Sequence, residues 1–593
     1  MADVKYEQKR WDLNDLFPGL GTPEIGDSLE ELDEQVGQFE TYRSRLAEDM
    51  DEELLLEILQ SYEGIVRRLS RLGGFASLKF SEDTQDQKAQ TFRAQMQKQS
   101  AEIDNRTMFF KLWWKSIGDQ PAGRLMDLSG DYRYWLETLR LQKPYTLSEP
   151  EEKIINIKDV NGPSAMVNLY STITNRYMFD FDVEGEKKEL TREELSSYFR
   201  SPKPELRKQA YQELYRLYEQ DAPILGMIYQ YIVRDWRSES VDLRGYTSPI
   251  SVRNLANDIP DEVVDTLLEV ARQNASLFHR FFELKARWLG TERIRRYDLY
   301  APVAKTEKTY DYQEAVGMVL DSFTKFDGRV ADLARKVFDE NHYDSEVRKG
   351  KRSGAFCSTV EPALTPWILQ SYDGKPRNVM TMAHELGHAV HSLLADEHTA
   401  VTQHASLPLA ETASTFGEML TVDYLLKQES DADIRRDILF HQMDDAYATI
   451  MRQAYFAMFE RDAHQAIAEG VSVDDMHVIY LDNLKHQFGA SLDMSDDFKY
   501  EWVAIPHFYF APFYVYAYAF GQLLVLSLYQ QYQEEGDAFK PRYFEILSAG
   551  GSASPQQILT RAGIDISRAS FWQGGFDVIE SKLKELEAIE VAE

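Results

Sequence analysis

The sequence predicts a mainly α-helical protein with a small β-sheet. Apolar residues recur at spacings of three and four, for example over residues 54–65 and 267–282, and charged residues fill the gaps. Strand patterns are few. One covers residues 177–183 and precedes the turn EGEKK, and the other pairs residues 354–360 with 367–372. The periodicity therefore favours helices packed on helices, with a small sheet in the second half of the chain.

Two helix-start signals mark a polar segment at residues 184–205. Thr191 begins the capping box T-R-E-E, in which the hydroxyl accepts from a free backbone N–H and Glu194 reaches back. Ser201 is followed by a proline, a residue favoured in the first turn of a helix. Because the segment is polar and rich in turn residues, we expect it to divide an N-terminal helical lobe, 1–195, from a larger lobe, 196–593.

Composition limits the classes of function. The chain has 593 residues, a formal net charge of -32 and one cysteine, Cys357. Such a surface repels nucleic acid and anionic lipid, so we expect neither as a partner. A single cysteine excludes an intramolecular disulfide and a cysteine-based zinc site, and it fits a reducing compartment. Without a signal-peptide pattern or a membrane-length apolar run, we expect a soluble cytoplasmic protein.

The segment TMAHELGHAVHSLL, residues 381–394, carries the strongest sign of chemistry. His384 and His388 are one helical turn apart, so both imidazoles can bind one metal ion. Glu385 lies beside them, where its carboxylate can hold a metal-bound water. The motif has only three specified positions and arises by chance, but polar residues inside so apolar a helix need partners. Gly387 costs roughly 1 kcal/mol in a helix, so we expect it to make room for a close neighbour.

A catalytic zinc site needs a third protein ligand and one open position. The all-histidine form of the motif would place glycine and then histidine where this chain has His391 and Leu394. Glu411, 23 residues after His388, is the remaining solution, a glutamate from a second helix. We therefore predict Glu411 as the third ligand and expect His391 to be an ordinary hydrogen-bonded or exposed histidine.

The second helix has its own start signal. Ser406 can cap it and Pro408 falls in its first turn. Glu418 follows Glu411 by seven residues on the same face, where it can orient a ligand histidine. We expect His404, in the preceding loop, to be hydrogen-bonded or exposed without a role in metal binding.

The aromatic segment IPHFYFAPFYVYAYAFG, residues 505–521, offers hydrogen-bond donors. An oxyanion formed during hydrolysis needs a donor besides the metal, and a phenol donates while it stays protonated at neutral pH. His507, Tyr514, Tyr516 and Tyr518 are the candidates. Aromatic segments most often belong to a core, so burial is the alternative interpretation.

These motifs together resemble the M3 family of zinc oligopeptidases, and within it bacterial oligoendopeptidase F; thimet oligopeptidase is a more distant likeness. The resemblance covers most of the chain. It rests on HELGH at 384–388, ETASTFGE at 411–418 and PHFYFAPFYVYAY at 506–518, with WDLNDLFPGL at 11–20, SLKFSEDTQD at 77–86, KRSGAFCS at 351–358 and FWQGGF at 571–576.

The resemblance implies two helical lobes around a deep channel, with zinc on its floor and a gluzincin-type HExxH helix. Such a channel admits short unstructured peptides and excludes folded proteins. His384, His388 and Glu411 fall on the family's metal ligands and Glu385 on its catalytic base. His507 falls on the family's substrate-binding histidine.

The tyrosines match the family pattern less well. More distant relatives have a tyrosine five residues after the histidine, but here that position is Pro512. Tyr516, nine residues after His507, matches the next family tyrosine, so Tyr514, Tyr516 and Tyr518 share the candidacy and Tyr516 is the leading candidate. The KRSGAFCS strand resembles the edge that binds peptide backbone by strand addition. This resemblance assigns substrate contacts to Gly354, Ala355 and Phe356, with Gly354 allowing close backbone approach.

We therefore expect a catalytic lobe with one Zn2+ per chain that hydrolyses internal bonds of short unstructured peptides. Two histidines and a glutamate favour zinc over manganese or cobalt. A zinc carboxypeptidase of similar fold stays open and would need a cationic group for the substrate carboxylate. A non-catalytic peptide-binding protein is the other alternative, and Glu385 beside intact ligands argues against it. The sequence leaves the oligomeric state and the side-chain preference open.

Overall fold

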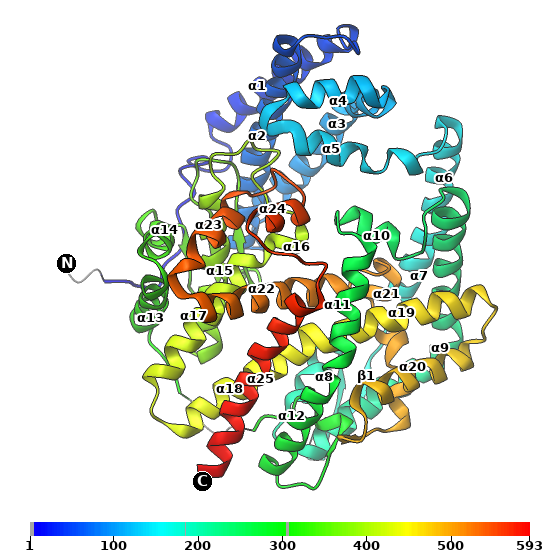
Figure 1. Ribbon diagram of the computed structural model, residues 1–593, viewed down its shortest axis with the longest axis vertical. Coiled ribbons are helices and arrows are strands. Elements are labelled where there is room, and N and C mark those ends of the chain that lie inside the picture. The colour runs from blue at the N-terminus through cyan, green and yellow to red at the C-terminus, as the bar shows by residue number, and fades with distance from the viewer. Residues whose placement is uncertain (1–4, 184, 304–307, 593) are drawn as a thin grey trace. The chain divides into compact units, whose positions relative to one another are not determined.

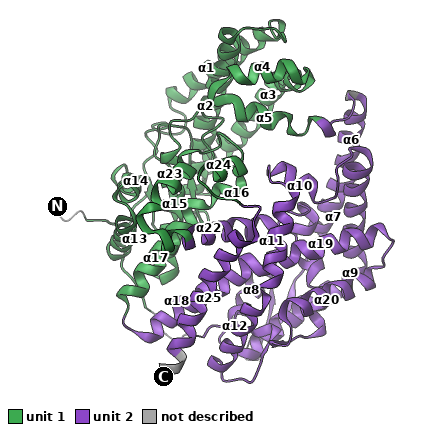
Figure 2. Ribbon diagram, viewed as in Figure 1, with its two compact units in different colours: residues 1–143, 307–429, 531–565 green, residues 144–306, 430–530, 566–593 purple. Residues whose placement is uncertain are grey.

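Helices dominate the computed structural model, which describes residues 5–183, 185–303 and 308–592 (Figure 1). The chain forms two units, which we call unit 1, with residues 1–143, 307–429 and 531–565, and unit 2, with residues 144–306, 430–530 and 566–593 (Figure 2). Each unit is thus assembled from three separate segments of the chain. Within the described ranges, no helix combines the length and the apolar character that crossing a bilayer requires.

Unit 1 carries twelve whole helices and one sheet among its described residues. The helices are α1 (Pro23–Thr41), α2 (Glu52–Glu82), α3 (Gln87–Ser116), α4 (Asp119–Leu128), α5 (Arg133–Leu141), α13 (Tyr312–Phe326), α14 (Gly328–Asp339), α15 (Pro376–Leu394), α16 (Leu407–Ala410), α17 (Thr412–Gln428), α23 (Lys540–Ser548) and α24 (Pro555–Arg561). The strands are β4 (Tyr343–Asp344), β5 (Ala355–Ser358) and β6 (Trp367–Gln370).

Unit 2 is also mostly helical, with a β-hairpin and a short parallel pair of strands. Its helices are α6 (Glu149–Asn161), α7 (Pro163–Thr174), α8 (Arg192–Ser197), α9 (Pro204–Arg237), α10 (Ser251–Ala256), α11 (Asp261–Gln273), α12 (Ala275–Trp288), α18 (Ala432–Ala446), α19 (Arg452–Ala468), α20 (Val473–Phe488), α21 (His507–Phe510), α22 (Tyr516–Glu535, whose last residues belong to unit 1) and α25 (Ala569–Ala592). Its strands are the pairs β1 (Phe179–Val183) with β2 (Glu186–Leu190) and β3 (Ile294–Arg295) with β7 (Leu492–Asp493).

The polar segment 184–205 lies inside unit 2, so the two units do not follow the expected division into 1–195 and 196–593. Its polarity has a local cause. The predicted capping box is confirmed, since the Thr191 N–H donates to Glu194 Oε2 at 2.8 Å and the Glu194 N–H donates to Thr191 Oγ1 at 3.3 Å. These polar residues therefore start helices within one unit, where local patterns alone suggested a boundary.

The sheet of unit 1 confirms the predicted pairing of the second strand segment. Its order is β4-β6-β5, with β4 parallel and β5 antiparallel to β6. Trp367 and Leu369 of β6 enter the same hydrophobic core as α1 to α5. Burial of these large side chains ties the sheet to the N-terminal helices and leaves β5 at the sheet edge beside α15.

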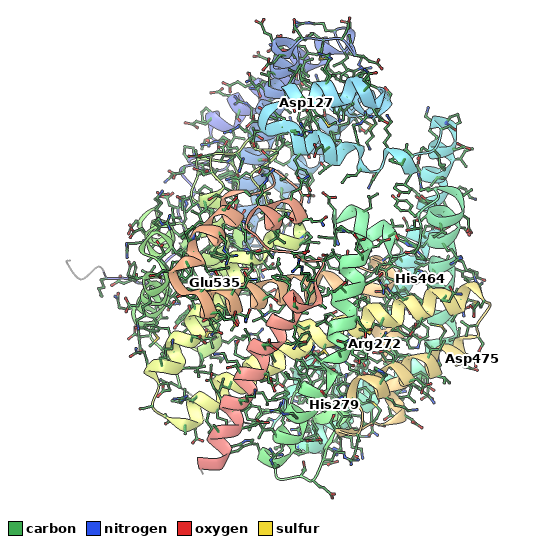
Figure 3. The ribbon with its side chains drawn as sticks, viewed as in Figure 1. Asp127, Arg272, His279, His464, Asp475 and Glu535 are labelled. Atoms are coloured by element: carbon green, nitrogen blue, oxygen red, sulfur yellow. The ribbon has the colours of Figure 1, made fainter. Side chains whose placement is uncertain are left out.

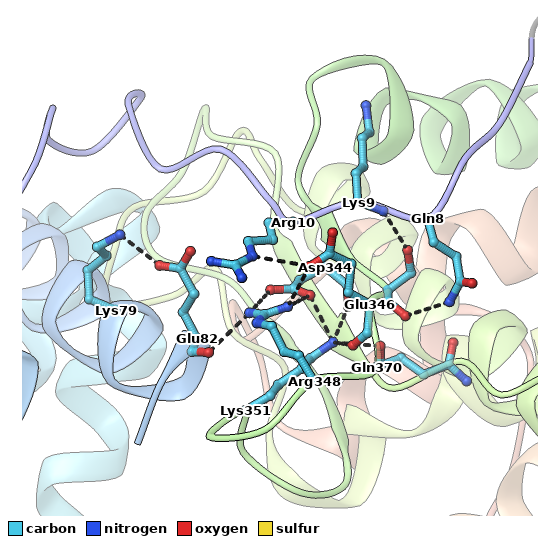
Figure 4. A network of polar contacts seen from close by, with 11 residues as sticks. Gln8, Lys9, Arg10, Lys79, Glu82, Asp344, Glu346, Arg348, Lys351 and Gln370 are labelled. Carbon is cyan, nitrogen blue, oxygen red and sulfur yellow. Dashed lines mark hydrogen bonds and ion pairs between the residues drawn. The ribbon is translucent and has the colours of Figure 1, made fainter. Parts of the chain in front are cut away.

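A polar network holds the loop that leads into β5 (Figure 4). Asp344 on β4 is fully buried, and Arg348 and Lys351 neutralise its carboxylate at 2.5 and 2.8 Å. The Lys351 ammonium also donates to the carbonyls of Glu346 and Gln370, each at 2.8 Å. Because a buried carboxylate without partners is very costly, this network fixes the loop and with it the position of β5.

Candidate metal centre and active site

The HExxH motif lies on α15, which packs side by side with α17 (Figure 1). The predicted start signal of the second helix is confirmed, with Ser406 as the N-cap of α16 and Pro408 in its first turn. Glu411 occupies the break between α16 and α17, where it is the N-cap of α17. This break turns the glutamate side chain toward the two histidines on the neighbouring helix.

The three predicted ligands converge on one point. His384 Nε2 and His388 Nε2 lie 3.3 and 3.4 Å from the same atom, Glu411 Oε2. Atoms bound at about 2.0–2.1 Å to one tetrahedral ion lie roughly 3.3–3.4 Å from each other. The donor set and its spacing therefore fit a tetrahedral divalent ion such as zinc.

The pKa values of these three residues also show that the cluster favours a positive charge. Burial lowers the pKa of His384, but Glu411 and Glu418 outweigh it and raise that pKa to about 10. Burial raises the pKa of Glu411, yet its contacts with His384, His388 and Ser414 bring it down to about 2. For His388, burial prevails and lowers the pKa. The carboxylates thus draw one positive charge to this point, and a metal ion would take the place of the proton.

Two further residues contact His384 and Glu411. Glu418 Oε2 lies 3.7 Å from His384 Nδ1, the nitrogen opposite the one that faces Glu411. A carboxylate at this position favours the tautomer that leaves Nε2 free for a metal. Ser414, which the sequence analysis missed, donates its hydroxyl hydrogen to Glu411 Oε2 at 2.6 Å. The sequence signal for this contact was the position of Ser414, three residues after Glu411, the N-cap of α17.

Glu385 lies beside the ligands in a nearly dry environment, with 6% of its surface exposed. Burial raises its pKa to about 7, while the nearby His384 charge and the backbone N–H of Cys357 favour the ionised form. A carboxyl group with a pKa near neutrality can both accept and return a proton. Its position and acidity suit a general base that later acts as an acid.

The β5 strand borders a cavity of about 540 Å³ that is also lined by His384, His388 and Glu385. The Cys357 N–H bonds to Glu385, so it points away from β6. Backbone groups alternate sides along a strand, so the N–H and C=O of Ala355 face the same open edge. Gly354 has φ of +84°, a conformation that favours glycine, and no atom lies within 4 Å of a Cβ built there. Its role in backbone approach stays a prediction.

The predicted donors from the aromatic segment lie in unit 2, where they separate into two environments. His507 and Tyr518 are exposed, with Tyr518 OH 3.5 Å from His507 Nε2, and the rings of Tyr514 and Tyr518 are 5.4 Å apart. Tyr516 is 1% exposed, and its hydroxyl accepts from Asn257 Nδ2 at 2.9 Å. Helical geometry explains the difference between Tyr516 and Tyr518, because residues two positions apart at the start of α22 lie on nearly opposite faces of the helix, whereas Tyr514 lies in the turn before it.

Two family models and several characterised proteins match this chain over most of its length. The family model described as peptidase family M3 matches residues 197–578, and one described as oligopeptidase F matches residues 125–179. Group B oligopeptidase PepB from Streptococcus agalactiae is 29% identical over 98% of this chain and 97% of its own. Oligopeptidase PepF from Bacillus subtilis is 27% identical over 99% of this chain and 88% of its own.

Solved structures agree with these matches. The structure of a Chlamydophila abortus protein, described as a peptidase, superposes with a TM-score of 0.88 at 26% identity and covers 98% of both chains. Oligoendopeptidase-F from Enterococcus faecium has a TM-score of 0.70 at 22% identity, over 96% of this chain and 99% of its own, a likeness of fold. The mainly helical fold predicted from the sequence is confirmed.

Proposed function

Because the chain belongs to peptidase family M3, we propose that it is a zinc-dependent endopeptidase that cleaves internal bonds of short unstructured oligopeptides. The convergence of His384, His388 and Glu411 on one point, with Glu385 beside it, carries this proposal. Relatives named oligopeptidases support the substrate class. The single cysteine and the acidic surface support a cytoplasmic location.

In this proposal each residue of the site has a separate role in hydrolysis. His384, His388 and Glu411 would hold a zinc ion, which would lower the pKa of a water molecule and polarise the carbonyl under attack. Glu385 orients the attacking water, accepts its proton at a carboxylate oxygen and passes that proton to the leaving nitrogen. Water adds its oxygen to the carbonyl carbon as the C–N bond breaks, which gives a carboxylate and an amine. Glu418 and Ser414 keep the ligands oriented.

The open edge of β5 supports binding of the substrate as an added strand. Ala355 presents its backbone groups on this edge, next to the N–H of Cys357 that holds Glu385. Main-chain hydrogen bonds of this kind accept many sequences but require an extended peptide. We propose Gly354, Ala355 and Phe356 as backbone contacts, and His507 and Tyr518, supported by Tyr514, as hydrogen-bonding groups for the substrate.

The two alternative functions receive less support. A carboxypeptidase needs a cation to hold the substrate's terminal carboxylate, and none of the described residues lining the cavity is a lysine or arginine. A non-catalytic peptide-binding protein has no use for a buried carboxyl group with a pKa near 7 beside the ligand set.

Mass spectrometry of a mixed peptide library tests the proposal. Digestion by the purified protein, with and without a chelator, reports internal or terminal cleavage, length limits and metal dependence together. We expect internal cleavage of short peptides, no cleavage of folded proteins, no activity with chelator, and cleavage at least about 10²-fold slower in a Glu385→Gln preparation. Cleavage confined to one terminal residue, or activity within tenfold of wild type in Glu385→Gln, would exclude this assignment.

A further inference from the structure

The loop before α22 holds a bulky residue in a strained conformation. Phe513 has φ of +58°, in the left-handed region that residues with a Cβ rarely adopt. Such a residue persists only where its surroundings fix it, and strain of this kind gathers at functional sites. The next residue is Tyr514, whose proposed role is to support His507 and Tyr518. The contacts that fix this loop therefore also set where Tyr514 lies.

Helix α19 holds the strained residue itself. Glu460 Oε1 accepts the Phe513 N–H at 2.8 Å, and both residues are fully buried. One turn further along α19, the His464 ring packs against the Phe513 ring, with 4.6 Å between the ring centroids. A hydrogen bond and a ring contact from one helix thus compensate for the unfavourable backbone conformation.

Helix α10 holds the residues on either side of this position. Arg253 Nε donates to the Pro512 carbonyl at 3.3 Å, and the Arg253 guanidinium carbon lies 5.8 Å from the centre of the Tyr514 ring. One turn later, Asn257 donates to the Tyr516 hydroxyl at 2.9 Å. Because Arg253 and Asn257 are four residues apart, both contacts come from one face of α10. The position of α10 therefore sets the position of the loop.

Arg253 directs its charge to the loop and to no carboxylate. The residue is half-buried and makes no ion pair with any described residue, although the chain has 98 aspartates and glutamates. A partly desolvated charge usually pairs with an opposite one. The planar guanidinium can donate through Nε and still lie near an aromatic ring, so Arg253 contacts the Pro512 carbonyl and the Tyr514 ring together.

The Tyr514 ring connects Arg253 to the groups proposed to bind the substrate. It lies parallel to the His507 ring, with 6.3 Å between centroids, and nearly perpendicular to the Tyr518 ring at 5.4 Å. Burial raises the pKa of Tyr518, and the neighbouring Tyr514, which hydrogen-bonds to it, raises that pKa further. A displaced Tyr514 would therefore release the Tyr518 hydroxyl from its present orientation.

We propose that Arg253 is a positioning residue for hydrolysis, which holds Tyr514 where it orients the Tyr518 hydroxyl toward the substrate. The proposal rests on the peptidase function proposed above. Arg253 acts through Tyr514 and needs no bond to the substrate itself. A purely structural contact would instead affect the stability of the fold and leave turnover unchanged.

Kinetics of Arg253→Met on a short fluorogenic peptide separate these two roles. Methionine keeps an unbranched apolar stem but removes the donor and the charge. We expect kcat to fall about 10–100-fold, with KM, zinc content and unfolding temperature nearly unchanged, because small misplacements of groups near the reaction have costs of this size. Arg253→Lys keeps a cation near the ring and should recover part of the loss.

Arg234→Met is the matched control. Arg234 is an exposed arginine of α9 that lies over the Tyr231 ring, and its replacement should leave kcat at the wild-type value. An equal loss of kcat in Arg234→Met, or a wild-type kcat in Arg253→Met, would contradict the proposal.

A double-mutant cycle with Tyr514→Phe tests whether Arg253 acts through Tyr514. If it does, Tyr514→Phe alone lowers kcat, and adding Arg253→Met lowers it further by less than about twofold. Losses that multiply independently would overturn the proposal, as would a wild-type kcat in Tyr514→Phe.

Hydrogen exchange over residues 511–516 tests the same contact without any cleavage. Arg253→Met should speed exchange of these backbone amides, because the loop loses one of its contacts, and Arg234→Met should not. Unchanged exchange in Arg253→Met would overturn the role of Arg253. Absence of all cleavage by the wild-type protein would instead refute the peptidase function.

Discussion

A Cβ atom on Gly387 would lie 2.4 Å from the backbone oxygen of Ala413 and 2.6 Å from the Cα atom of Ser414. Helices α15 and α17 thus meet backbone to backbone at the turn that carries His384 and His388. Because Glu411 lies two residues before Ala413, this close approach brings the proposed third ligand within reach of the two histidines. The expected reason for a glycine inside the HExxH helix is confirmed.

Gly387→Ala should therefore damage the metal site as well as the fold. The contact is with backbone atoms, which cannot rotate away, so the helices must separate. Overpacking of this kind costs about 1–3 kcal/mol and sometimes more. We expect a lower midpoint of thermal unfolding and weaker zinc binding, measured by calorimetry and by competition with a chromogenic chelator.

Gly317→Ala is the matched control for this substitution. Gly317 lies inside α13, and a Cβ atom there meets no atom within 4 Å. Replacing a helical glycine by alanine without a clash stabilises by roughly 0.5–1 kcal/mol. If Gly387→Ala matched Gly317→Ala in stability and in zinc affinity, the close helix contact would have no role in building the site.

Glu385→Gln should separate metal binding from catalysis. The amide keeps the size of the side chain but cannot accept a proton from water. We expect kcat/KM to fall about 10²–10⁴-fold while zinc content stays at one ion per chain. Glu397→Gln, at an exposed position just after α15, should retain activity. A Glu385→Gln enzyme within tenfold of wild type would remove Glu385 from the role of base.

The three oxygen-bearing residues around the ligand histidines should form a graded series in metal affinity. Glu411→Gln removes the carboxylate at 3.3 Å from His384 and should weaken zinc binding most. Glu418→Gln and Ser414→Ala disturb only the orientation of ligands, and such changes cost about 10–100-fold in affinity. Chelation should abolish wild-type activity and lower the unfolding temperature, since zinc binds only the folded site. Wild-type affinity in Glu411→Gln would exclude it from the ligand set.

Local sequence patterns predicted the parts of this site that depend on local geometry. His384 and His388 are one turn apart in any helix, and Ser406 and Pro408 mark the helix start before Glu411. The opposite faces of Tyr516 and Tyr518 also follow from helical spacing.

The contacts that set the pKa and the position of Glu385 depend on the tertiary structure. The N–H of Cys357 reaches Glu385 from a strand 28 residues earlier. Pairing with β6, burial of Trp367 and Leu369, and the network around Asp344 together hold that strand in place. The division into two units also depends on tertiary contacts, so it could not be predicted from local sequence patterns. Each is built from three segments, and long-range burial, which leaves no local pattern, brings those segments together.

Tyr516 and Tyr518 should respond differently to loss of their hydroxyls. Tyr516→Phe leaves the buried Asn257 amide without its partner, so we expect about 1–3 kcal/mol of lost stability. Tyr518→Phe removes an exposed donor, with little change in stability and, if it acts on the substrate, about 10²-fold lower kcat. Thermal unfolding and steady-state kinetics on both variants measure this. A kcat loss in Tyr516→Phe at unchanged stability would return the catalytic role to Tyr516.

Glu460 in α19 should make stability fall as pH rises. It lies one turn before His464, which Figure 3 labels, and it is fully buried. Its Oε1 accepts from the Phe513 N–H at 2.8 Å, and Oε2 has no partner among the described residues. Burial raises its pKa to about 8, from an ordinary value of 4.5.

The folded protein therefore holds this proton more tightly than the unfolded chain does. Ionisation costs nothing below the unfolded pKa, and the penalty grows as pH rises from about 4.5 to 8. Glu460→Gln keeps the acceptor for Phe513 and cannot ionise. We expect equal unfolding free energies for the two proteins near pH 4.5 and a gain for the variant, on the order of a few kcal/mol at most, near pH 8. Denaturant titrations across this range measure the difference, and a constant difference at every pH would show that Glu460 does not titrate there.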